Sequence, residues 1–262
     1  MNASAKKSAL WLPPLLAGAC IVAIWYAAIA IFNIPTYLLP APHQVLHALW
    51  REQASLFPAL LRTGGSALAG FSTAVMGGAV VALALASSRW LKAALYPWVL
   101  IIQMVPVVVM VPIFVIWFHA GLPSITAIAF VISFFPILAS TTLGLVSTDR
   151  GQLELFTVLQ ASKAQEIFLL RLPSALPYFL SGVKIAATLA PIGAISGEFL
   201  AGTTPDSLGY LLLIYRSDPG KMPEVFAIAF VACALGFLFV GGVKLLSWWL
   251  LRHWHESERS GE

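Results

Sequence analysis

The sequence predicts an all-α protein that crosses a membrane six times. Hydrophobic residues occupy 60% of the 262 positions and charged residues only 10%, whereas a soluble globular domain carries about 25% charged residues. The apolar residues fall into six stretches, each near the roughly 20 residues that a helix needs to cross a bilayer. Polar turns or turns marked by proline and glycine separate these stretches. Together the observations predict one membrane domain over residues 1–262.

The six predicted spans follow one another along almost the whole chain. The first is too long for the apolar region of a signal peptide and has no clear small-residue cleavage site, so we expect it to remain as a membrane helix. Pro106, Pro112 and Pro136 are expected to interrupt the third and fourth spans, because proline removes a backbone donor, and these two helices should border a central path. The predicted spans are Leu10–Phe32, Gly64–Ala86, Ala93–Phe118, Leu122–Val146, Tyr178–Ala201 and Val225–Leu246.

The connection between the first two spans contains an amphipathic stretch, His43–Leu49, which we expect to rest on the outer surface. Six crossings place both termini on one side of the membrane. Most Lys and Arg residues fall on that side, which the positive-inside rule identifies as cytoplasmic. They are Lys6, Lys7, Arg89, Lys92, Arg150, Lys163, Arg171, Lys184, Lys244, Arg252 and Arg259, against Arg51, Arg62, Arg216 and Lys221 on the other side.

No motif for bond-making chemistry occurs in the sequence. It lacks a GxxxxGK[ST] phosphate loop, a GxSxG elbow, an HExxH pair and a dinucleotide-binding glycine pattern. The two cysteines lie in predicted spans and the five histidines are scattered, so neither a disulfide nor a metal site is expected. No basic run is interleaved with aromatic residues, which argues against nucleic-acid binding. We therefore expect no enzymatic activity and no cofactor in this chain.

The fifth predicted span contains two charged residues, Lys184 and Glu198. Lys184 is expected near its cytoplasmic end, where the side chain can reach the interface, and Glu198 near its outer end. Glu198 is interpreted as a solvated interfacial carboxylate in preference to a gate or protein contact. Gly193 and Gly197 form a small-xxx-small pair and Pro191 permits a bend, so this face suits close helix packing, within the chain, along a translocation path or between subunits. A proton-driven carrier would hold an ionisable group deeper in the bundle.

The connection from residue 147 to residue 176 is the longest on the cytoplasmic side. Its composition predicts two short helices at an angle, Gln152–Gln160 and Ser162–Arg171, each with an apolar stripe. Pro173 and Pro177 are expected to end the second helix, so that the fifth span begins beyond Leu176. Periodicity alone leaves two alternatives for this element: a helix lying on the membrane surface, or a site where another protein docks.

The spacing of particular residues in this connection resembles the permease subunits of bacterial ATP-binding-cassette importers. Their cytoplasmic loop carries the pattern E-A-A-x₃-G-x₉-I-x-L-P, and Glu154, Leu172 and Pro173 match it in register, with Leu170 as a conservative replacement. Other positions depart from the pattern. Phe156 stands at an alanine position, and Gln160 stands where the family has its glycine, at the turn between the two short helices, so Gln160 is expected to strain or reshape that bend.

Four other segments extend the resemblance to the branch that includes permeases for sulfonates, nitrate, taurine and thiamine precursors. They are Tyr37–Pro42, Gln103–Pro106, Ser133–Ile137 and Leu208–Leu211. The stretch Lys184–Phe199 looks closest to permeases for pyrimidine thiamine precursors or similar flat heterocycles. The resemblance implies a coupling site that seats on an ATPase, made of Glu154, Phe156, Gln160, Ala161, Ser162, Leu170, Leu172 and Pro173.

The resemblance also implies the partners. These are cytoplasmic ATPase subunits that bind ATP and Mg²⁺, a periplasmic substrate-binding protein, and a second copy of the chain in the bacterial inner membrane. The substrate would be a small solute, either a thiamine-precursor pyrimidine or similar heterocycle, or an anion of the sulfonate or nitrate type. A gradient-driven carrier and a membrane scaffold without transport activity are the alternative functions.

Overall fold

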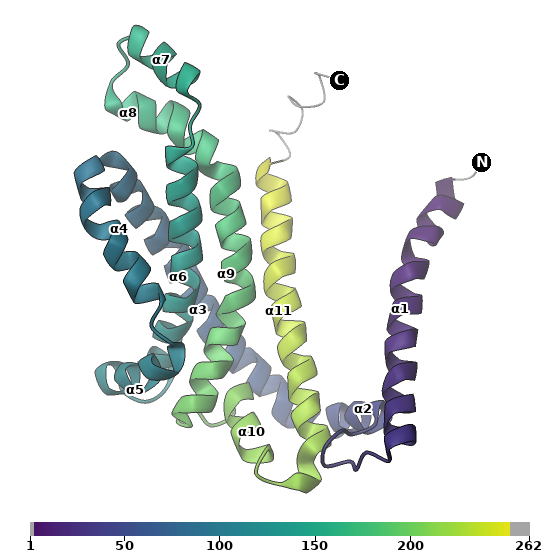
Figure 1. Ribbon diagram of the computed structural model, residues 1–262. Helices are drawn as coiled ribbons and strands as arrows, with labels where there is room; N and C mark the ends of the chain where they lie inside the picture. Colours follow the sequence, from purple (N-terminus) through teal and green to yellow (C-terminus); the bar gives the residue numbers. More distant parts are fainter. Residues whose placement is uncertain (1–2, 252–262) are drawn as a thin grey trace.

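The computed structural model describes residues 3–251, and this part of the chain is a bundle of helices joined by short turns (Figure 1). Five helices are long and apolar enough to cross a membrane, and a sixth crossing is formed if a bent pair counts as one span. The prediction of an all-α membrane protein is confirmed. The elements are α1 (Ala3–Phe32), α2 (Pro42–Arg51), α3 (Gln53–Ser87), α4 (Arg89–Gln103), α5 (Val107–Phe118), α6 (Leu122–Val146), α7 (Arg150–Val158), α8 (Lys163–Gln165), η1 (Glu166–Arg171), α9 (Leu172–Ala201), α10 (Leu208–Tyr215), η2 (Pro219–Lys221) and α11 (Met222–Leu251).

The third predicted span is not a single helix. It breaks into α4 and α5, whose axes differ by 101°. The break falls at Pro106, which supplies no backbone donor and disfavours helical geometry in the residue before it. Pro112 and Pro136 lie inside α5 and α6 without ending either helix, so the prediction that all three prolines interrupt their spans is correct only for Pro106.

Two other boundaries differ from the prediction. The outer connection is mostly helical, because α2 covers the predicted amphipathic stretch and α3 begins at Gln53, well before Gly64. The predicted helix end at Pro173 and Pro177 is also wrong, since both prolines lie within α9. Residues Lys163–Ala201 instead form one helical run of 39 residues. A six-residue π-helix, η1, ends at Arg171, two positions before Pro173, and its wider turn accommodates the ring that would clash with an α-helical turn.

The centre of the bundle is the packing of α3 and α9 on either side of α6. Small residues permit the close approach. A Cβ atom at Gly182 of α9 would lie 2.8 Å from the Pro136 carbonyl oxygen, and one at Gly70 of α3 would lie 2.6 Å from the Ala129 Cβ. Helices in lipid gain little from hydrophobic burial against one another, so van der Waals contact across such small residues holds them together.

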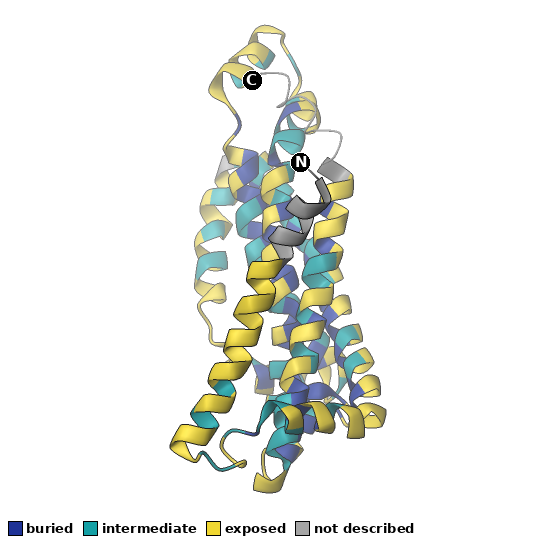
Figure 2. Ribbon diagram, turned by 90° about the vertical axis from the view of Figure 1, so that its right-hand side faces the viewer, coloured by how far each residue is buried: buried dark blue, intermediate teal, exposed yellow. Residues whose placement is uncertain are grey.

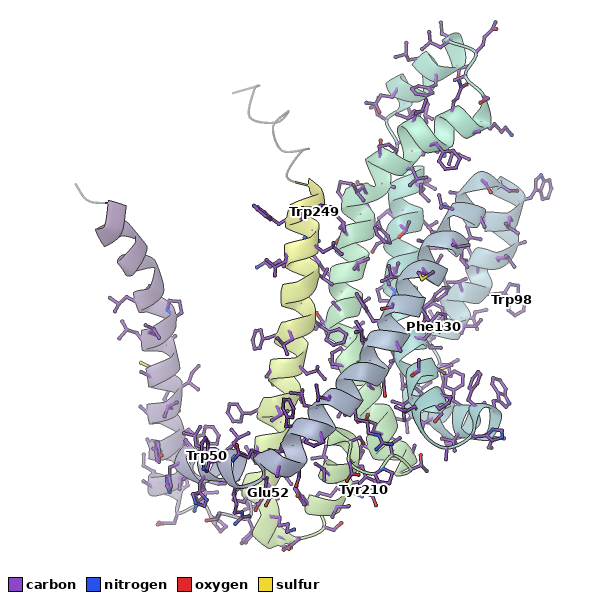
Figure 3. All side chains as sticks on the ribbon, turned by 180° about the vertical axis from the view of Figure 1, so that it is seen from behind. Trp50, Glu52, Trp98, Phe130, Tyr210 and Trp249 are labelled. Atoms are coloured by element: carbon purple, nitrogen blue, oxygen red, sulfur yellow. The ribbon has the colours of Figure 1, made fainter. Side chains whose placement is uncertain are left out.

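Helix α1 stands apart from this centre. From Leu12 to Phe32 no residue of α1 is buried, and most of its side chains are exposed (Figure 2). The first described residues of α1 and the end of α11 lie on the same side of the bundle as α7 and α8 (Figure 1), as six crossings require. Trp50 and Tyr210 mark the opposite end from Trp249 (Figure 3), the placement that aromatic residues favour at the two membrane interfaces.

Candidate functional site

The turn between α7 and α8 contains Gln160 in a left-handed conformation, with φ = 53°. The Ala161 amide donates to the Phe156 carbonyl and the Gln160 amide to the Thr157 carbonyl, both at 3.0 Å. These two bonds form a Schellman motif, in which the left-handed position is usually glycine because a Cβ there is unfavourable. Gln160 therefore adopts the strained backbone that the sequence led us to expect at this bend.

The second short helix is joined firmly to the membrane bundle. Ser162 begins it, since its Oγ accepts from the Gln165 amide at 3.3 Å while the Gln165 side chain accepts from the Ser162 amide at 2.8 Å. At its other end the Arg171 Nε donates to Glu166 Oε1 at 2.6 Å, and Arg171 Nη1 donates to the Leu145 carbonyl oxygen at 3.3 Å. Arg171 thereby caps the end of α6, where a positive charge also complements the helix dipole.

The segment Arg150–Arg171, which we call the coupling element, projects beyond the bundle at the end where α7 and α8 lie (Figure 1). Of the residues predicted for the coupling site, Glu154, Gln160 and Ser162 are exposed, Phe156, Ala161, Leu172 and Pro173 are half-buried, and Leu170 is buried. The structure thus divides the set into a group at the projecting tip and a group rooted in the bundle. The tip also presents apolar side chains that no described residue covers: Leu155, Val158, Leu159, Phe168 and Leu169, each more than half exposed.

Glu198 near the C-terminal end of α9 is 1% exposed, so the expectation of a solvated interfacial carboxylate is wrong. Thr63 Oγ1 of α3 donates to Glu198 Oε2 at 2.8 Å, and the Gly209 amide of α10 donates to the same oxygen at 3.1 Å. Thr63 Oγ1 also accepts from the Leu208 amide at 3.0 Å. One buried carboxylate therefore joins α3, α9 and the beginning of α10.

The first turn of α10 depends on these side chains. Its leading amides have no partners within the helix, and Thr63, Glu198 and Ser207 accept from Leu208, Gly209 and Tyr210 in turn. Glycine is needed at position 209 for α10 to pack this closely on α9, because a Cβ there would lie 2.5 Å from the Glu198 Cβ and from the Ile195 carbonyl oxygen. The sequence analysis missed Thr63 and Ser207. Ser207 before an apolar run was a recognisable N-cap signal, whereas nothing in the sequence linked Thr63 to Glu198.

Gly193 and Gly197 face α6. A Cβ at Gly193 would lie 2.8 Å from Ile132 Cδ1, and one at Gly197 would lie 2.9 Å from Ile128 Cδ1. Of the three alternatives for this pair, the structure selects packing within the chain. Pro191 is buried in the middle of α9 and does not end the helix.

The bend between α4 and α5 borders a cavity of about 330 Å³ against α6. Gln103 contributes an amide to its lining and Phe135 an aromatic ring, while most of the remaining lining residues are aliphatic. The broken third span and α6 therefore border an open hollow. That these helices line a central path stays a prediction. Neighbouring space of about 410 Å³ is lined by α5, α6 and α9 residues that include Ser196 and Phe199.

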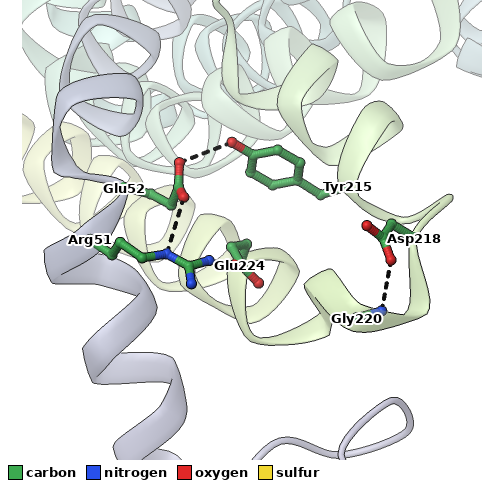
Figure 4. Close-up of polar contacts among 6 residues, drawn as sticks. All are labelled: Arg51, Glu52, Tyr215, Asp218, Gly220 and Glu224. Atoms are coloured by element: carbon green, nitrogen blue, oxygen red, sulfur yellow. Dashed lines mark hydrogen bonds and ion pairs between the residues drawn. The ribbon is translucent and has the colours of Figure 1, made fainter.

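At the end of the bundle opposite α7 and α8, a charged cluster ties α2 to α11 and α10 (Figure 4). Arg51 forms an ion pair with Glu224, and its Nε lies 3.4 Å from Glu52 Oε1. Tyr215 Oη donates to Glu52 Oε2 at 3.2 Å. Burial, and then the adjacent Glu52 carboxylate, raise the pKa of Tyr215, which keeps its hydroxyl as a donor. These contacts join α2 to α10 and α11 at the end of the bundle opposite α7 and α8.

Comparison with known proteins identifies the family. Residues 74–250 match the model for the inner membrane component of binding-protein-dependent transport systems. The chain belongs to this family. It is 34% identical to the formylaminopyrimidine transport permease protein ThiX of Halalkalibacterium halodurans over 92% of this chain and 95% of that one. It is 35% identical to the riboflavin transport system permease protein RibX of Chloroflexus aurantiacus over 75% of this chain and 73% of that one.

A more distant relative and a solved structure agree with this assignment. The putative aliphatic sulfonates transport permease protein SsuC of Bacillus subtilis is 26% identical over 96% of this chain and 91% of its own. The fold resembles a crystal structure of an amino acid ABC transporter with histidines, with a TM-score of 0.62 and 13% identity over 75% of this chain and 94% of that one. The permease is thus a multi-pass protein of the inner membrane.

Replacing Gln160 by Gly should stabilise the turn of the coupling element, because the left-handed conformation costs a residue with a Cβ roughly 1 kcal/mol more than glycine. Amide hydrogen exchange across residues 156–166 should become slower. Gln152→Gly is the matched control inside α7, where glycine is unfavourable, so exchange should become faster. Faster exchange in Gln160→Gly would show that the turn does not require a left-handed residue.

Replacing Glu198 by Ala should lower the free energy of unfolding by about 1–3 kcal/mol for each buried donor left unpaired. Glu198→Gln should lose much less, because its amide oxygen can still accept from Thr63 and Gly209. Thermal unfolding of the purified permease in detergent measures both, and Glu154→Ala controls for loss of an exposed carboxylate. Equal losses in the Gln and Ala variants would mean that the negative charge, not the acceptor, stabilises α10.

Proposed function

We propose that the permease imports a small solute delivered by a periplasmic binding protein, and that its coupling element docks on a cytoplasmic ATPase. The chain supplies the membrane path, and ATP and Mg²⁺ are bound by the partner. One observation carries the proposal: the coupling element holds five exposed apolar side chains on a projection beyond the membrane bundle. Membership of the binding-protein-dependent family supports a protein partner for that projection over the membrane surface.

The coupling element is built so that a force on its tip can be transmitted to the membrane helices. Its tip is rigidified by the Schellman turn and the Ser162 cap, and its root is held by Arg171 against the end of α6. A pull on the tip would therefore reach both α6 and α9. Switching a bundle from 1:99 to 99:1 between two conformations takes about 5.5 kcal/mol, and ATP binding in the partner is the proposed source of this free energy.

Two copies of the permease are proposed to form the path. The outward surfaces of α4 and α5 expose apolar side chains, including Met104, Val108, Ile116 and Trp117, and the cavity at the α4–α5 bend lies on this side of the chain. A two-fold pair would bring these surfaces together around the path. The termini are proposed to be cytoplasmic, since the described charged residues at the coupling-element end include Arg150, Lys163 and Arg171.

A nitrogen heterocycle is the proposed class of solute. Among the relatives, ThiX is named for formylaminopyrimidine and RibX for riboflavin, and both are more than 30% identical to this chain. SsuC, named for aliphatic sulfonates, is less similar. Aromatic side chains at Phe135 and Phe199 beside the membrane cavities suit a flat ring.

Changing Val158 to Asp should remove the ATPase from the purified complex, because it places a charge in the exposed apolar tip, where Val158 is 78% exposed. Mass spectrometry of the tagged permease, purified gently from its native membrane, measures the stoichiometry of the bound P-loop ATPase. Glu154→Ala and Leu172→Asp should reduce ATP-dependent uptake while the bundle stays assembled.

Leu38→Asp is the control, since Leu38 is 62% exposed at the opposite end of the bundle; this variant should retain the ATPase. An undiminished amount of bound ATPase in the Val158→Asp variant would contradict docking through the tip. A partner set without any ATPase, together with no uptake, would favour a scaffold, and uptake that collapses with the proton gradient while ATP persists would favour a carrier.

A further inference from the structure

Lys184 lies deep in the membrane bundle, contrary to its expected place near the end of the fifth span. Its depth follows from α6, a helix of 25 residues whose middle is Phe134. Gly182 packs beside Pro136 and Ile137, and Gly193 packs beside Ala129 and Ile132. Lys184 is between these two glycines, close to Gly182, so it stands next to the middle of α6.

The ammonium group cannot reach either interface from this depth. At 1.5 Å per residue, Pro136, which lies beside Gly182, is about 15 Å from the Val146 end of α6. The four-carbon stem of lysine covers little more than one helical turn, about 5.4 Å. In α9 the side chain also inclines toward the N-terminal end of the helix, yet even in that direction it stops well inside the bundle.

The side of α9 that carries Lys184 is uncovered in the single chain. The residues exposed along it include Ser181, Lys184, Thr188 and Ile192. None of the ion pairs among the described residues involves Lys184. A charged side chain at this depth would be expensive against lipid tails, and such groups normally face other protein or water. The Thr188 hydroxyl adds less to this cost, because it donates to the Lys184 carbonyl oxygen at 3.3 Å.

Direct packing of this face against a second copy, without water between them, does not remove the cost of the buried charge. If this face of α9 met its symmetry mate directly, two uncompensated ammonium groups would be buried near each other, and burial of unpaired charge is strongly unfavourable. A water-filled space accommodates the same groups readily. Ile192, on the same face, also borders the hollow that Ser196 and Phe199 line farther along α9.

We propose that this face of α9 lines the aqueous path of the assembled permease. Lys184, flanked by the hydroxyl groups of Ser181 and Thr188, is a mid-membrane subsite for an anionic or electron-pair-donating group of the transported solute. The inference rests on the proposed import function and adds to it the residues that would contact the solute in the middle of the membrane. A ring nitrogen, a carbonyl oxygen or an acidic group can accept a hydrogen bond from the ammonium group.

Thiol labelling tests the subsite without knowledge of the solute. In a background with Cys20→Ala and Cys233→Ala, a single Thr188→Cys variant is assembled with its native partners in proteoliposomes. Its labelling rates are measured with two membrane-impermeant methanethiosulfonates, one anionic and one cationic. Both should react, the anionic reagent being favoured by Lys184. Adding Lys184→Met should lower the anionic-to-cationic rate ratio about fivefold, as expected for one nearby charge in a largely aqueous space, whereas Lys184→Arg should preserve it.

Val80→Cys is the control at matched depth. Val80 is 65% exposed on α3, and the neighbouring Gly78 packs on Ile137 at the level of Gly182. This thiol should react with neither reagent if that face meets lipid. A Thr188 thiol as unreactive as Val80→Cys, or a rate ratio unchanged by Lys184→Met, would overturn the subsite.

The amount of ATPase in the same preparation separates the two proposals. An ATPase present with an unreactive Thr188 thiol would contradict only the subsite. An ATPase absent from the preparation would contradict the import function itself, and reactivity of Thr188→Cys would then show an aqueous path without ATP-driven coupling. Thermal unfolding of Lys184→Met confirms that the variant remains folded.

Discussion

Close contact between α6 and its two neighbours is the constraint on which the rest of the permease depends. Lipid surrounds the bundle, so helices must gain their attraction from contact between surfaces rather than from leaving water. Gly70, Gly182 and Gly193 remove the side chains that would hold α3 and α9 away from α6. Because these contacts fix how far along α6 each residue of α9 lies, they also fix the depth of Lys184 and of Glu198.

The polar groups inside the bundle are arranged around the same three helices. The start of α10 is buried, where water is not available to pair with its first amides, and side chains from α3 and α9 supply the acceptors. A buried helix terminus without such partners would be unstable. The arrangement makes α10 part of the α3–α6–α9 unit, although α10 follows α9 through a separate turn. Glu198 is therefore understandable as a structural acceptor, and its burial does not require a proton-transfer role.

The sequence predicted features that depend on local chemistry and missed those that depend on contacts between distant residues. Apolar length located five spans, and the left-handed Gln160 followed from one position in a short pattern. The effects of proline were less predictable. Pro106 breaks its span, whereas Pro136 is held in a continuous α6 whose backbone packs directly on Gly182. Composition does not reveal which proline has such a neighbour.

The positions of Glu198 and Lys184 were likewise beyond what local sequence patterns could predict. Both were assigned to interfaces because distance from the predicted ends of the fifth span was the only available measure. The contacts of Gly182 with Pro136 and Ile137 instead place Lys184 beside the central part of α6. The burial of Glu198 required the partner Thr63, which is 135 positions away in the chain. No local pattern carries information about such a contact.

The continuous run Lys163–Ala201 connects all the proposed functional parts of the permease. This run of 39 residues has the coupling element at one end, Lys184 within it and Glu198 near the other end. A loop at Pro173 would have absorbed a movement of the coupling element. The π-helical segment instead keeps the backbone helical while Arg171 joins it to α6. Under the proposed function, movement of the ATPases would therefore tilt α6 and α9 as a pair and change the spacing of the Lys184 faces in two copies, without first unfolding a joint.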